Sequence, residues 1–61
     1  MKKSTLKQLA MIDLLIRTGN FDSASRSLSD LIRSSRSEKE VQELWDIAKE
    51  LGLAENENFI I

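Results

Sequence analysis

Hydrophobic positions along the chain fall into three segments separated by short polar or glycine-containing breaks. Within each segment the apolar residues recur at spacings of three and four, which is the period of an amphipathic helix and not of a strand. Gly19, the serine-rich stretch 34–37 and Gly52 mark the breaks, because glycine ends helices readily and serine favours turns. The pattern predicts an all-α fold with helices over about residues 5–18, 22–35 and 38–51.

The first segment is the most apolar stretch of the chain. Eight of the twelve side chains in residues 6–17, LKQLAMIDLLIR, are apolar, and on a helical wheel they extend almost all the way round. Leu9, Ile12 and Ile16 form one stripe with Met11 and Leu15 beside it, and we expect these residues to face two neighbouring helices. The surplus of apolar surface predicts that this helix belongs to the core and also contacts a partner.

A further strip on the same helix consists of Leu6, Ala10 and Leu14, which share a face because they are spaced i, i+4 and i+8. An apolar strip with a rim of mixed charge is typical of a protein interface. We therefore predict that this strip binds the partner, the alternative being that the C-terminal tail covers it. The charged residues at its rim are Lys7, Asp13 and Arg17.

The second and third segments each carry a single narrow apolar stripe, opposite a face of serine and charge in the second segment. Ser37 and Glu40 form an S-x-x-E capping box at the start of the third helix, and Thr5 and Gln8 form a T-x-x-Q box at the start of the first. The stripe residues are Phe21, Ala24, Leu28, Leu31 and Ile32 in the second segment, and Val41, Leu44, Trp45, Ala48 and Leu51 in the third.

These elements predict one small antiparallel three-helix bundle over residues 1–53, a helical hairpin plus a third helix. Residues 54–61 are expected to form a short, loose C-terminal tail. The tail ends in Phe59, Ile60 and Ile61, which either dock onto the bundle or insert into a partner.

Composition narrows the functions that the chain can serve. A domain of 61 residues is marginally stable alone, so tight packing and oligomerisation are its available aids. Cysteine and histidine are both absent, which removes the commonest catalytic bases, nucleophiles and transition-metal ligands. No glycine-rich phosphate loop, nucleophile elbow or acidic calcium loop is present. We expect a protein that is not an enzyme and that binds neither a cofactor nor a metal.

The N-terminal lysines raise the question of targeting, because Lys2 and Lys3 precede an apolar run. Asp13 interrupts this run and no small-residue cleavage site follows it, so it does not have the pattern of a signal peptide. The run is also too short to span a bilayer. We expect a cytoplasmic protein with no membrane partner.

Nucleic-acid binding is the main alternative to protein binding. Arg26, Arg33 and Arg36 fall near one another on the second helix and are the candidate nucleic-acid face. Acidic residues are interleaved with them, and the net charge of −1 with a pI near 5.3 lacks the basic footprint of a nucleic-acid binder. The interleaved acidic residues are Asp22, Asp30 and Glu38.

The turn between the first two helices resembles two known families. Residues 19–24, GNFDSA, are similar to the inter-helix turn of a tetratricopeptide repeat, although the chain holds one such unit and lacks the proline that usually follows the second helix. Residues 18–28, TGNFDSASRSL, look like the opening of a LysR-type winged helix-turn-helix, although no proline-led recognition helix follows. The first resemblance implies protein binding and the second implies DNA binding.

Taken together, the sequence predicts a small non-enzymatic interaction or regulatory protein that presents an apolar helical face to another protein and forms a homodimer. A small DNA-binding regulator that uses the three arginines is the alternative. A third possibility is a subunit that folds fully only within a larger complex, which would lose helix on dilution.

Overall fold

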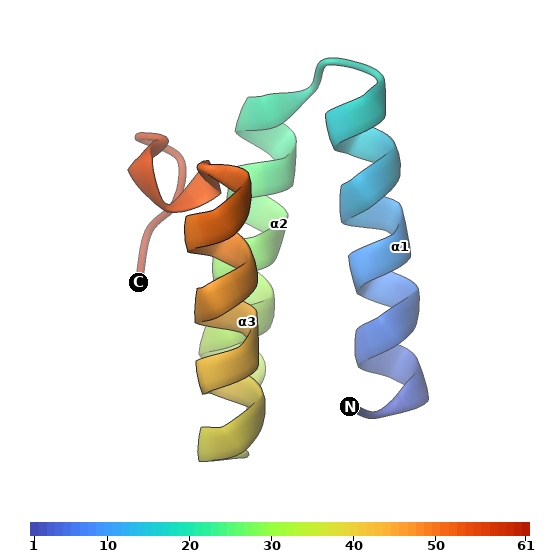
Figure 1. Ribbon diagram of the computed structural model, residues 1–61, viewed down its shortest axis with the longest axis vertical. Coiled ribbons are helices and arrows are strands. Elements are labelled where there is room, and N and C mark those ends of the chain that lie inside the picture. The colour runs from blue at the N-terminus through green and yellow to red at the C-terminus, as the bar shows by residue number, and fades with distance from the viewer.

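The computed structural model describes residues 1–61 and contains three α helices followed by a short 3-10 turn (Figure 1). Helix α1 runs from Lys3 to Arg17, α2 from Phe21 to Ser34 and α3 from Glu38 to Leu51, and the turn η1 covers Leu53–Glu55. Helices α1 and α3 point in one direction and α2 in the other (Figure 1). The predicted all-α, antiparallel three-helix bundle is therefore confirmed.

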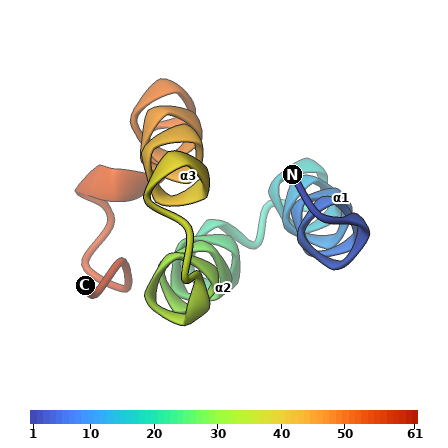
Figure 2. The ribbon, with the colours of Figure 1, turned by 90° about the horizontal axis from the view of Figure 1, so that it is seen from below.

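The centre of the bundle is α2, and not the more apolar α1. Both α1 and α3 pack against α2, whereas no Cα atom of α1 lies within 8 Å of a Cα atom of α3. Viewed along the helices, α1 and α3 lie on two sides of α2 (Figure 2). The prediction that α1 faces two neighbouring helices is wrong, because α1 has one neighbouring helix along its length.

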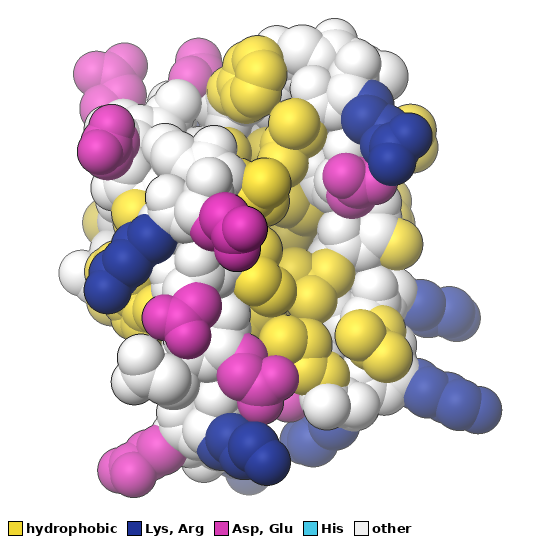
Figure 3. All heavy atoms as spheres, viewed as in Figure 1, with side chains coloured by type: hydrophobic (Ala, Val, Ile, Leu, Met, Phe, Trp, Pro, Cys, Tyr) yellow, Lys and Arg dark blue, Asp and Glu magenta, His cyan; other side chains and the backbone are white.

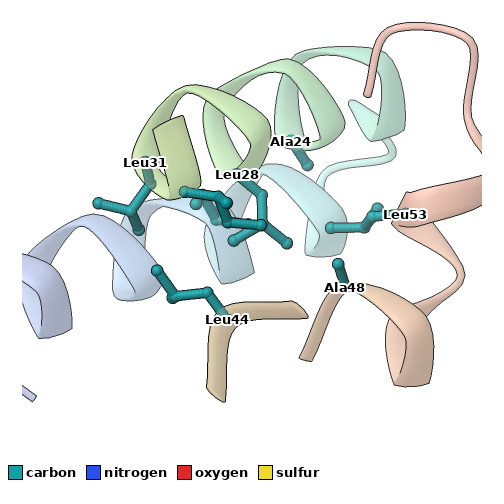
Figure 4. Packing of buried hydrophobic residues seen from close by; sticks show 8 residues of the cluster. Ala24, Leu28, Leu31, Leu44, Ala48 and Leu53 are labelled. Atoms are coloured by element: carbon teal, nitrogen blue, oxygen red, sulfur yellow. The ribbon is translucent and has the colours of Figure 1, made fainter. Parts of the chain in front are cut away.

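The core forms where α2, α3 and η1 meet, with Leu28, Leu44 and Leu53 almost completely buried at its middle (Figure 4). Helix α2 buries six of its 14 residues, while α1 buries only Thr5 and Ile12 of its 15. Three of the six buried residues of α2 are small, which allows neighbouring segments to approach closely. The small buried residues of α2 are Ala24, Ser25 and Ser29.

The helix ends follow the sequence signals at three of the four positions where a signal is strong. Gly19 and Gly52 adopt left-handed backbone conformations with φ of 82° and 77°, a region that glycine enters without steric cost. The Ser37 hydroxyl accepts a hydrogen bond from the Glu40 backbone N–H at 3.3 Å, so the predicted cap of α3 is present.

The predicted cap at Thr5 is wrong. Helix α1 begins at Lys3 with Lys2 as its N-cap, which places Thr5 inside the first turn. Its side chain is buried, and its hydroxyl donates to Glu40 Oε1 at 2.9 Å across to α3. The same carboxylate oxygen accepts from the Ser35 hydroxyl at 3.3 Å, so Glu40 joins the three helices at one end of the bundle.

The segment after α3 is not a loose tail. Leu53 is buried, and the Asn56 side-chain amide donates to Asp22 at 3.0 Å. Arg26 donates to Asn58 at 3.0 Å, and the ring of Phe59 meets Trp45 edge to face at 5.2 Å between centroids. The segment therefore covers the side of α2 and α3 that faces away from α1 (Figure 2).

Candidate interaction surface

The strip predicted to bind a partner lies on the outer surface of α1. Leu6 is 54% exposed and Leu14 is 60% exposed, and Ala10 between them is exposed as well. We call these three residues the α1 strip. The alternative that the tail covers the strip is wrong, because the tail packs on the opposite side of the bundle.

The rim of the α1 strip is charged, as the sequence predicts. Arg17 Nε lies 2.9 Å from Asp13 Oδ2, and both side chains are largely exposed. Such an exposed pair one helical turn apart contributes only about 0.3–0.5 kcal/mol. Lys7 is also exposed. The rim therefore has little effect on stability, and its side chains are available to a partner.

Three large apolar side chains of the predicted stripes are about half exposed or more. Met11 is 67% exposed, Phe21 is 50% exposed and Leu51 is 49% exposed, so these three residues lie outside the buried core. Met11 lies at the edge of its stripe, whereas Phe21 is the first residue of α2 and Leu51 is the last residue of α3. Met11 borders a hollow that it shares with Leu15 and with Ser27 of α2.

A second apolar surface lies between α1 and α3, and Figure 3 shows it as a continuous hydrophobic stripe along that face. Met11 and Leu15 lie beside Ser27, on the side of α2 that is remote from α3. The residues on the opposite edge of α1 therefore face toward α3. On α3, Trp45 contacts Phe59 of the tail. The edge of α3 opposite Trp45 therefore faces toward α1.

We call this surface the α1–α3 groove. The two helices do not meet along it, and the groove is bounded by exposed or half-buried apolar side chains. Sequence analysis missed it because each stripe considered alone is too narrow to reveal it. The one available signal is the spacing i, i+4 and i+8 of Glu43, Ile47 and Leu51. The groove residues are Leu6, Leu9 and Ile16 on α1, and Ile47 and Leu51 on α3.

The three arginines of the candidate nucleic-acid face do not form one open basic surface. Arg26 donates to Asn58 of the tail, and Arg33 pairs with Asp30 one turn away on α2. Arg36 lies outside α2, in the loop before α3, beside hollows lined mainly by serine and glutamate. The structure thus separates the third arginine from the first two and gives each of the first two a polar partner.

The C-terminal residues divide into two groups. Phe59 is half buried against Trp45, so it docks onto the bundle. Ile60 and Ile61 are both exposed and remain candidate contacts for a partner.

The polar chemistry of the molecule is sparse. The hollow around Glu40 is lined by hydroxyl and charged groups from all three helices, including Lys2, Thr5 and Ser34. Its central carboxylate accepts hydrogen bonds from two hydroxyls of the same chain, which is the arrangement of a structural junction. No three metal-binding side chains lie close together. None of the three α helices combines the length and the apolar character that a membrane-spanning helix requires.

Comparison of the chain with models of protein families, with curated proteins and with solved structures finds no match.

Proposed function

We propose that this chain is a small, non-enzymatic interaction protein that acts by presenting the α1 strip to another protein and that forms a homodimer through it. One observation supports the proposal above all others. The most apolar helix is the least buried, with Leu6 and Leu14 both more than half exposed. Apolar side chains that cluster on a surface and are rimmed by charge typically mark a binding site.

The order of side chains in the α1 strip suits a symmetric pairing. Ala10 is small and stands midway between Leu6 and Leu14, so a second α1 can approach closely there. An antiparallel partner helix centred on Ala10 would bring each Leu6 alongside Leu14 of the other copy. This self-complementary contact is what an isologous dimer requires.

The same strip could engage a different protein, since its residues offer mainly shape and apolar area. Fully burying a leucine that starts exposed contributes about 1.5–3 kcal/mol. Leu6 and Leu14 are already partly covered, so each contributes less than this. Association itself costs roughly 4–15 kcal/mol, and we therefore expect a weak dimer that dissociates on dilution.

The test is Leu14→Lys followed by sedimentation velocity over a range of concentrations. A lysine at position 14 places an unpaired charge against Leu6 of the other copy, so we expect the variant to sediment as a monomer where the wild type sediments as a dimer. Phe21→Lys is the control, since Phe21 is also half exposed but stands at the start of α2 and outside the α1 strip. If Leu14→Lys keeps the wild-type mass, the α1 strip is not the interface.

A further inference from the structure

We propose that the α1–α3 groove binds an amphipathic helix from a different protein, one with Lys or Arg along one edge of its apolar face. The groove is distinct from the outer part of the α1 strip, because Leu14 points away from it by helical register. This inference therefore does not depend on self-association through Leu14.

The arrangement of the helices indicates what kind of element fits. Viewed along the helix axes, α1 and α3 both flank α2 and stand apart from each other (Figure 2), and the hydrophobic stripe runs along the side between them (Figure 3). A helix placed there would complete a four-helix bundle and would contact α1 and α3 together. At 1.5 Å per residue, the 14 residues of α3 offer a helix of about four turns a full-length contact.

The apolar lining of the groove supplies contacts on both of its walls. Leu6 and Leu51 are about half exposed, while Leu9, Ile16 and Ile47 pack partly against the core. A docked helix would cover the exposed parts of all five side chains without rearranging the core. This is the pattern by which an amphipathic helix binds in a hydrophobic groove.

The charges along the groove indicate which kind of helix would bind there. Helix α3 carries five acidic and two basic residues, and carboxylates follow its side of the hydrophobic stripe (Figure 3). Glu43 precedes Ile47 and Leu51 by one and two turns on the same edge. The hollow beside Glu43 also contains Lys39, so the acidic character of this wall rests on the excess of carboxylates along α3 as a whole.

The opposite wall is neutral, because Asp13 and Arg17 pair with each other there. The groove as a whole is therefore acidic on one side only. A helix with lysine or arginine along the edge that faces α3 matches this field, and a helix with glutamate there is repelled by it.

The experiment uses the full chain and two labelled synthetic peptides of four helical turns. Both carry leucine on one face; one has lysine along an edge of that face, and the other has glutamate at the same positions. Fluorescence anisotropy at about 0.15 M salt, where the Debye length is about 8 Å, is expected to show binding of the lysine peptide at least about tenfold tighter than the glutamate peptide, a difference of about 1.4 kcal/mol.

Variants of the chain locate the binding. Leu51→Lys and Glu43→Lys are each expected to weaken the lysine peptide by about tenfold or more, and circular dichroism checks that each variant keeps its helices. Glu57→Lys makes the same charge change at an exposed site in the tail and should bind almost as the wild type does. Leu14→Lys should also leave peptide binding unchanged.

Four results would overturn the proposal. Equal affinity for the two peptides would show that charge does not select the occupant. An equal loss in Glu43→Lys and Glu57→Lys would show that only net charge matters. Loss of self-association in Leu51→Lys, with Leu14→Lys still a dimer, would show that a second copy fills the groove. If Leu14→Lys abolishes self-association and peptide binding is absent, the groove inference alone fails.

Discussion

At the scale of single residues, the most unusual side chain is Ser25. It is completely buried on α2, and its hydroxyl has no hydrogen-bond partner. A buried polar group without a partner costs about 1–3 kcal/mol. Ser29, one turn later and equally buried, donates instead to the backbone carbonyl of Arg26 at 2.9 Å. Both positions require a small side chain, and only Ser29 uses its hydroxyl.

We therefore expect Ser25→Ala to stabilise the protein. Alanine keeps the side chain small and removes the unpartnered hydroxyl, which should raise the free energy of unfolding by about 1 kcal/mol and Tm by roughly 4–8 °C. Ser29→Ala is the matched control, because it makes the same gain in helix propensity but loses a hydrogen bond. Thermal unfolding followed by circular dichroism measures both, and equal shifts in the two variants would contradict the assignment.

Thr5 and Glu40 illustrate what sequence patterns do not determine at this scale. Both belong to capping-box patterns, and the predicted hydrogen bond from the Glu40 backbone N–H to the Ser37 hydroxyl forms. The Thr5 hydroxyl is used across the bundle instead, on the Glu40 carboxylate. A local pattern specifies which hydrogen bonds are possible within one helix, whereas the partner actually chosen depends on which helices meet.

At the scale of elements, the three helices and their breaks follow from apolar period and glycine placement, and the sequence predicts them to within two residues at each end. Which helix occupies the centre does not follow from apolar content. Helix α1 is the more apolar, yet α2 is central because it is the middle helix of the chain and both α1 and α3 pack against it. The exposure of Met11 and Leu51, and with it the groove, depends on this arrangement and was therefore missed.

The segment after α3 provides the prediction at this scale. Trp45 is the only tryptophan, so its emission reports on the Phe59 contact directly. Phe59→Ala should shift the emission to longer wavelength and lower the free energy of unfolding by at least about 0.5–1.5 kcal/mol, the contribution of an aromatic pair beyond buried area. Ile61→Ala removes an exposed apolar side chain nearby and should change neither quantity. Unchanged emission in Phe59→Ala would show that the tail is not docked in solution.

At the scale of the whole molecule, charge is unevenly distributed. Residues 1–37 carry seven basic and three acidic residues, whereas residues 38–61 carry two basic and seven acidic residues. Since α1 and α3 lie on two sides of α2 (Figure 2), the near-neutral net charge conceals a basic side and an acidic side. The net charge of the whole chain therefore says little about its partners. A partner would respond to the local charges at the α1 strip and at the α1–α3 groove.

Size sets the final expectation. A chain of 61 residues at about 0.05–0.15 kcal/mol per residue has roughly 3–9 kcal/mol of stability, and a dimer adds stability that depends on concentration. We expect the Tm of the wild type to rise over a hundredfold increase in protein concentration, and the Tm of Leu14→Lys to stay constant over the same range. A wild-type Tm that does not change with concentration would mean that the monomer is stable with the α1 strip exposed, so that the strip would have to serve a different protein. Loss of helix on dilution would instead indicate a chain that folds only when it is assembled. In that case the isolated monomer is not stably folded, and association supplies the free energy that folding lacks.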